Sequence, residues 1–83
     1  MPELTLYYRA DCGYCRKVLR FINDQQISLT LKNVAEGQAI RQELIAVAGS
    51  TQVPCLVING RPMHESDDII RWLRENKVNH DHP

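Results

Sequence analysis

The segment Ala10–Val18 reads ADCGYCRKV, and the spacing of its two cysteines decides how the chain is interpreted. Cys12 and Cys15 stand three residues apart, and Arg16 and Lys17 follow them directly. Such a pair is a redox centre, half of a zinc site, or two reduced cysteines of a core. The glycine, the tyrosine and the charges around the pair favour the redox centre.

A strand precedes this pair and a helix follows it. Leu4–Tyr8 is apolar and aromatic, which predicts a strand. Val18, Leu19 and Ile22 recur at the spacing of one helix face, with Asp11 or Cys12 at the capping position. The cysteine pair is therefore predicted where a first strand gives way to a first helix.

This position predicts different roles for the two thiols. Unpaired N–H groups at a helix start and nearby cations lower a cysteine pKa from roughly 8.5 to about 3.5–7.5. We therefore expect Cys12, with Arg9 and Arg16 close in sequence, to be the exposed nucleophile. Cys15 comes about one helical turn later and is expected to be the sheltered, resolving thiol. A zinc site would need Cys55 and His64 to complete four ligands.

The rest of the chain predicts an α/β fold in the order β-α-β-α-β-β-α. Residues 27–34 alternate like a half-buried strand, residues 36–49 fit a helix stopped by Gly49, and a last helix opens at Ser66. Between them, residues 53–63 predict two strands joined at Asn59-Gly60. A parallel first pair and this hairpin make a four-stranded mixed sheet, with three helices covering both faces.

Composition limits the function classes. A chain of 83 residues has room for one core, so we expect one domain over residues 1–83, with a flexible tail from about 77 to 83 that includes His80 and His82. Ten basic residues balance ten acidic ones, which argues against nucleic-acid binding. No apolar run approaches the length of a membrane span, and the segment Met1–Ala10 lacks the basic start and long apolar stretch of a secretory signal, so we expect a cytoplasmic protein. We also expect a monomer. Three cysteines are too few for a disulfide scaffold.

Three segments resemble the glutaredoxin family. YYRADCGYC (7–15) is similar to its first strand, basic residue and Cys-x-x-Cys motif, and TQVPCLVINGRPM (51–63) to its Thr-Val-Pro segment and hairpin, with Gln52 where threonine is usual. ESDDIIRWL (65–73) is similar to its closing helix. The resemblance implies a thioredoxin-like fold, a single glutaredoxin-like domain and a cis peptide bond before Pro54.

The resemblance also implies a glutathione site beside Cys12. In the family the backbone of the residue at Val53 pairs with the cysteinyl part of glutathione, the start of the last helix holds the γ-glutamyl end, and the basic residue at Arg9 faces the glycyl carboxylate. Arg41 is expected to assist. The implied glutathione-binding set is Arg9, Tyr14, Arg41, Val53, Pro54, Glu65, Ser66 and Asp67.

Two positions depart from the glutaredoxin pattern. His64-Glu65 stands where the family has a Gly-Gly pair, and Glu65-Ser66 instead resembles the N-terminal domain of glutathione transferases, where this pair binds the γ-glutamyl group. A transferase needs a second, helical domain, which we do not expect in 83 residues. Gly13 replaces the usual proline, and some family members without that proline hold a [2Fe–2S] cluster between two subunits.

We therefore expect a glutathione-dependent thiol–disulfide oxidoreductase that reduces protein or glutathionyl disulfides through Cys12 and Cys15. Glutathione is the co-substrate, and the exchange needs no metal. Two alternatives stay open: a dimer that binds a [2Fe–2S] cluster, and a glutathione-binding adaptor with weak catalysis. The partners expected are glutathione and disulfide-containing or glutathionylated proteins, with neither nucleic acid nor membrane.

Overall fold

The computed structural model describes residues 3–77. The tail expected from about residue 77, with His80 and His82, lies almost wholly outside the described residues. The helices and strands within residues 3–77 follow the predicted order β-α-β-α-β-β-α, with one additional short 3₁₀ turn.

Four strands form one mixed sheet in the spatial order β2-β1-β3-β4. The strands are β1 (Leu4–Tyr8), β2 (Thr30–Asn33), β3 (Cys55–Ile58) and β4 (Arg61–Met63). β1 pairs with β2 in parallel and with β3 antiparallel, and β3 and β4 form an antiparallel hairpin. The predicted parallel start and the hairpin at the opposite edge are both confirmed.

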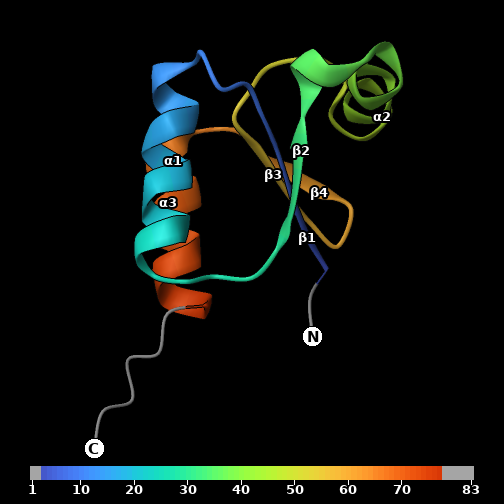
Figure 1. The fold of residues 1–83 in the computed structure, drawn as a ribbon. Helices are drawn as coiled ribbons and strands as arrows, with labels where there is room; N and C mark the ends of the chain where they lie inside the picture. The colour runs from blue at the N-terminus through green and yellow to red at the C-terminus, as the bar shows by residue number, and fades with distance from the viewer. Residues whose placement is uncertain (1–2, 78–83) are drawn as a thin grey trace, which may run out of the picture.

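Three α-helices cover the two faces of the sheet. They are α1 (Gly13–Asp24), α2 (Gln38–Ala48) and α3 (Ser66–Asn76), and the 3₁₀ turn η1 (Val34–Glu36) precedes α2. α1 and α3 lie side by side on one face, whereas α2 lies on the other face (Figure 1). This arrangement is the thioredoxin-like fold that the resemblance implies.

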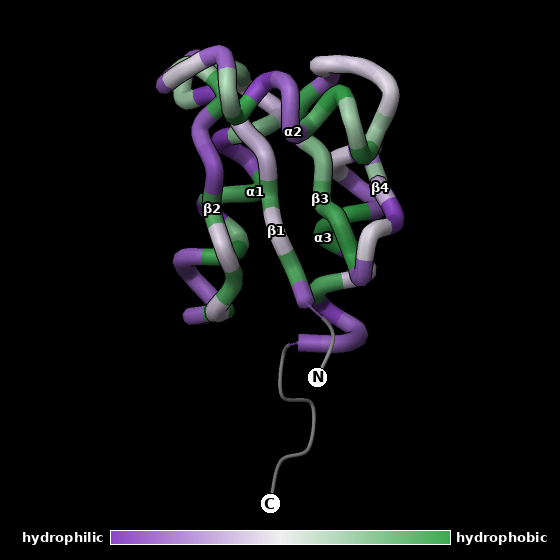
Figure 2. Tube along the Cα trace, turned by 90° about the vertical axis from the view of Figure 1, so that its right-hand side faces the viewer, coloured by the Kyte–Doolittle hydropathy of each residue, from purple (hydrophilic) through white to green (hydrophobic). Residues whose placement is uncertain are grey.

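The alternation of side chains along β1 divides the core into two clusters. Leu4 and Leu6 point toward α1 and α3, whereas Tyr7 points toward α2. Figure 2 shows the hydrophobic character of β3, whose four residues are all apolar and contribute alternately to the two clusters. The cluster under α1 and α3 consists of Leu4, Leu6, Val18, Ile22, Leu56, Ile69, Ile70 and Leu73. The cluster under α2 consists of Tyr7, Val34, Leu44, Cys55 and Val57.

The two turn signals of the sequence act as predicted. Gly49 ends α2 with a left-handed backbone (φ 81°), and its N–H bonds to the carbonyl of Ile45. Asn59 and Gly60 both have positive φ, 50° and 86°, which is the geometry of a two-residue hairpin turn. These positions therefore fix where α2 stops and where β3 reverses.

The second strand is shorter than residues 27–34. The Ile27 N–H bonds to the carbonyl of Ile22 and so closes the end of α1 instead of joining the sheet. At the other end Val34 begins η1, whose first turn is capped by the Asn33 side chain through the Ala35 N–H at 2.9 Å. Leu31, expected on the half-buried face, is exposed because β2 is an edge strand.

No helix within residues 3–77 is long and apolar enough to cross a membrane.

Candidate active site

Cys12 caps the N-terminus of α1. Its backbone is extended, and its sulfur accepts a hydrogen bond from the Cys15 N–H at 3.4 Å. Burial raises the pKa of Cys12, but hydrogen bonds to its sulfur from the N–H and thiol of Cys15 and the N–H of Tyr14 outweigh it. The pKa of Cys12 therefore lies below the value of a free cysteine, and the side chain remains partly exposed.

Cys15 lies one turn further along α1 and is fully buried. Burial raises its pKa to about 11, helped by the hydrogen bond to Cys12 and by the charge of Cys12. The Arg9 N–H donates a hydrogen bond to the Cys15 sulfur at 3.5 Å, and this contact acts in the opposite direction by lowering the pKa of Cys15. The pair is reduced, and the two thiols differ in exposure and in pKa as the sequence predicts.

A hollow of about 430 Å³ brings together six of the eight residues expected to bind glutathione. Its volume falls within the range of about 300–1,000 Å³ typical of small-molecule pockets. The Val53–Pro54 bond beside it is cis, as the resemblance implies. Cys12 does not line the hollow but lies two residues before one of its lining residues, Tyr14. The lining residues are Tyr14, Gln52, Val53, Pro54, His64, Glu65, Ser66 and Asp67.

The hollow is lined by groups that attract an anion and by groups that attract a cation. Ser66, the buried first residue of α3, places the start of an 11-residue helix there, and a helix start attracts anions. Glu65 and Asp67 supply carboxylates that attract a cation. A ligand that ends in both an ammonium and a carboxylate group, as an amino acid does, therefore matches this end of the hollow.

The two arginines of the expected set lie elsewhere. Arg9 forms an ion pair with Asp11, with Nε–Oδ1 at 3.1 Å, and this contact lowers the pKa of Asp11. Arg41 donates from Nη1 to the carbonyl of Val34 at 3.2 Å. Neither arginine lines the hollow, and both are held by contacts within the chain.

Asp67 is paired across the two helices. The Lys17 Nζ on α1 lies 2.5 Å from the Asp67 Oδ1 at the start of α3. Hydrogen bonding and attraction to Lys17 lower the pKa of this carboxyl, so Asp67 is ionised at neutral pH. A cationic group of a ligand would compete with Lys17 for Asp67.

Two lining residues, Gln52 and His64, are absent from the expected set. The sequence marked both as departures from the glutaredoxin pattern, but a departure alone does not reveal a side chain's direction. His64 is the more informative, because its Nδ1 is buried without a hydrogen-bond partner within residues 3–77.

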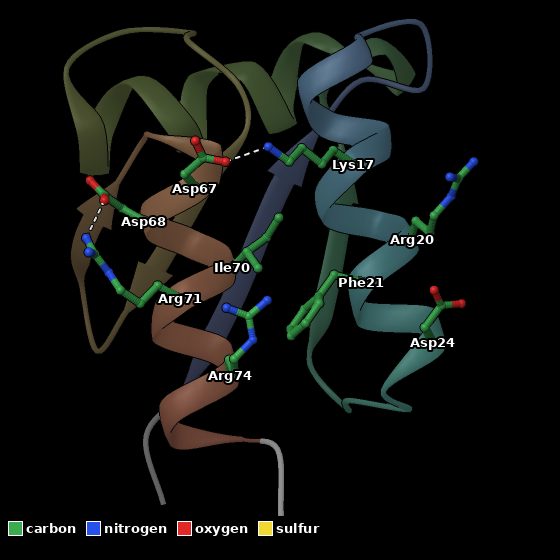
Figure 3. Close-up of a pocket in the computed structure, with 9 residues that line it drawn as sticks. All are labelled: Lys17, Arg20, Phe21, Asp24, Asp67, Asp68, Ile70, Arg71 and Arg74. Atoms are coloured by element: carbon green, nitrogen blue, oxygen red, sulfur yellow. Dashed lines mark hydrogen bonds and ion pairs between the residues drawn. The ribbon is translucent and has the colours of Figure 1, made fainter.

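A larger hollow, of about 550 Å³, lies between α1 and α3 (Figure 3). Phe21 and Ile70 line it together with charged side chains, and Arg74 lies over the Phe21 ring at 5.3 Å. Its lining residues include neither Tyr14 nor the residues of the cis bond, Val53 and Pro54. We therefore place the candidate site at the smaller hollow, beside Tyr14 and the cis bond.

Metal binding finds little support in the described part of the chain. No three His, Cys, Asp or Glu side chains within residues 3–77 are grouped to hold a metal ion. Cys55, which a zinc site would require, is fully buried in the cluster under α2. The four ligands that a zinc site would require are therefore not brought together within residues 3–77.

Comparison with known families agrees with this geometry. Residues 6–80 match the family described as glutathione S-transferase, N-terminal domain. The chain belongs to this family. It thus shares the thioredoxin-like N-terminal domain of glutathione transferases, which the Glu65-Ser66 segment indicated.

Individual relatives include glutaredoxins as well as transferases. Glutaredoxin 3 of Escherichia coli (strain K12) is 25% identical over 69 residues, 83% of each chain. The buckwheat glutaredoxin–glutathione complex is 21% identical, with a TM-score of 0.67, and covers 93% of this chain and 73% of that one. A delta-class glutathione transferase of Nilaparvata lugens is 30% identical with a TM-score of 0.74, but the matched region is only 38% of that chain. The resemblance to both families is thus confirmed.

Proposed function

We propose that the chain catalyses glutathione-dependent thiol–disulfide exchange with Cys12 as the nucleophile. The observation that carries the proposal is the capping position of Cys12: a partly exposed sulfur that accepts the Cys15 N–H at the start of α1. The lowered pKa of Cys12 increases its thiolate fraction at neutral pH. The thiolate is the form that attacks a disulfide.

The proposed reaction has two exchange steps. The Cys12 thiolate attacks the glutathione sulfur of a mixed disulfide, so that a Cys12–glutathione disulfide forms and the substrate leaves as a thiolate that takes a proton from water. The thiolate of a second glutathione then attacks this disulfide, which yields oxidised glutathione and restores the Cys12 thiolate. With a protein disulfide, the Cys12 thiolate would first form a mixed disulfide with one protein sulfur, and the other protein sulfur would leave as a thiolate. Cys15, after losing its proton to water, would then attack the Cys12 sulfur, which breaks the bond to the protein, releases the second protein thiolate and leaves a Cys12–Cys15 disulfide. Two glutathione molecules would reduce this disulfide and leave as oxidised glutathione.

The hollow supports glutathione as the co-substrate. We assign the cysteinyl part of glutathione to the backbone at Val53, and the γ-glutamyl end to Glu65, Ser66 and Asp67. The charges described above match the ammonium and carboxylate groups of that end. The solved glutaredoxin with a similar fold is a glutathione complex, which agrees with this assignment. Arg9 and Arg41 would have to leave their present partners to join the site.

A [2Fe–2S] cluster does not fit the residues of this chain alone. Clusters take four thiolate ligands, and of the three cysteines only Cys12 is not fully buried. One chain would therefore supply one of the four thiolates, and a second chain and glutathione would have to supply the other three.

The proposal is tested with a glutathionylated peptide, reduced glutathione and the intact chain. We expect release of the peptide thiol at a rate proportional to protein, and loss of this activity in Cys12→Ser. Binding of glutathione should survive that substitution, which separates catalysis from an adaptor role. An unchanged rate in Cys12→Ser would overturn the assignment, and binding without any catalysis in the unaltered chain would favour the adaptor.

A further inference from the structure

His64 joins β4 to α3 and lines the hollow next to Glu65. Its Nδ1 is the one buried side-chain nitrogen or oxygen left without a hydrogen-bond partner within residues 3–77. A buried polar atom without a partner is costly, by about 1–3 kcal/mol, and this cost bears on which ring nitrogen carries the hydrogen.

The burial of Nδ1 determines which nitrogen of the ring carries the hydrogen. A neutral imidazole carries one N–H and one lone pair. A buried N–H without an acceptor is rarer in proteins than a buried acceptor without a donor. We therefore assign the lone pair to the buried Nδ1 and the hydrogen to Nε2. Nε2 makes no hydrogen bond within residues 3–77 and is not buried. His64, which lines the hollow, therefore carries an N–H donor that no residue within 3–77 uses.

We propose that His64 is a ligand-binding residue whose Nε2–H donates a hydrogen bond to the α-carboxylate of the γ-glutamyl arm of glutathione. This inference rests on the function proposed above. The carboxylate is the fitting acceptor because Ser66 and the start of α3, next to His64, already attract an anion. The neighbouring carboxylates of Glu65 and Asp67 suit the ammonium group of the same arm instead.

The consequence is a gain in selectivity. A glycine at this position, as in the glutaredoxin pattern, offers no side-chain donor. With His64 a ligand that lacks the α-carboxylate leaves an N–H unpaired, and sites built around such donors discriminate strongly. His64 should therefore increase the preference for glutathione over thiols that lack this carboxylate.

The test uses two unreactive probes and the full chain. The probes are S-methylglutathione and its analogue with 4-aminobutyrate in place of the γ-glutamyl residue, which lacks the α-carboxylate. His64→Gln retains an amide N–H near the position of Nε2, His64→Asn retains one near Nδ1, and His64→Leu retains none. Dissociation constants are measured by calorimetry, and thermal unfolding shows that each variant is folded.

We expect His64→Leu and His64→Asn to weaken S-methylglutathione binding by about tenfold, and His64→Gln to restore most of it. The analogue should bind the unaltered chain and His64→Leu equally. Equal losses for both probes in His64→Leu, or rescue by Asn instead of Gln, would overturn the role of Nε2. A chain that reduces glutathionyl disulfides but is insensitive to His64→Leu contradicts this inference alone. A chain that does not bind S-methylglutathione contradicts the proposed function as well.

Discussion

The backbone N–H of Cys15 donates a hydrogen bond to the sulfur of Cys12 across 3.4 Å. The buried residue of the pair thus stabilises negative charge on the exposed one. Its own thiol has a pKa of about 11 because it is buried, so it stays protonated at neutral pH. One thiol is therefore prepared to attack, while the other is kept from competing with it.

This division of roles predicts that Cys15→Ser retains the glutathionyl route. Reduction of a glutathionylated peptide needs only Cys12, so we expect the rate to stay within about tenfold of the unaltered chain. Reduction of a protein disulfide by the two-thiol route should fall by more than that, because the resolving thiol is gone. Both rates are measured with the same glutathione supply. Equal losses on the two substrates would show that Cys15 does not act as a resolving thiol.

The left-handed backbone at Gly49 predicts that replacing this glycine destabilises the fold. A Cβ at Gly49 meets no atom within 4 Å, so Gly49→Ala is opposed by its φ of 81° and not by space. We expect a loss of about 1–2 kcal/mol in the free energy of unfolding, measured in urea. Gly13 also has open space but lies within α1 without a positive φ, so Gly13→Ala should stabilise by about 0.4–1 kcal/mol. A destabilised Gly13→Ala, or a neutral Gly49→Ala, would refute this interpretation.

Two neighbours on α2 test the cluster under that helix. Leu44 is fully buried, whereas Ile45 is 47% exposed. We expect Leu44→Ala to lower the free energy of unfolding by about 2–5 kcal/mol, and Ile45→Ala to change it by less than about 0.5 kcal/mol. Urea unfolding of the two variants gives both values. Similar costs at the two positions would mean that α2 packs through a different face.

The sequence predicts well those elements whose signals are local. Leu4–Tyr8 is a strand as expected, and the hairpin at Asn59-Gly60 forms because both residues tolerate positive φ. The strand expected over residues 27–34 is shorter because the Ile27 N–H bonds within the end of α1. That contact depends on how the helix ends, which alternation along the strand does not encode.

The candidate site likewise combines features that the local sequence predicts with features that it does not. The position of Cys12 at a helix start follows from the spacing of apolar residues after it, and the structure has it as the cap. The pairing of Asp67 with Lys17, fifty residues away, depends on how α3 packs against α1. The burial of one nitrogen of His64 likewise depends on the folded chain and not on the residues next to it in the sequence. Such contacts between distant segments leave no pattern within either segment.

The reactivity of Cys12 tests the central claim most directly. The rate of alkylation by iodoacetamide is measured from acidic to alkaline pH, with each modified cysteine assigned by mass spectrometry and glutathione as the reference thiol. Since only the thiolate reacts, a lowered pKa predicts a midpoint for Cys12 below that of glutathione, and much slower labelling of the buried Cys15. A Cys12 midpoint equal to or above that of glutathione would contradict the claim that the start of α1 activates this sulfur.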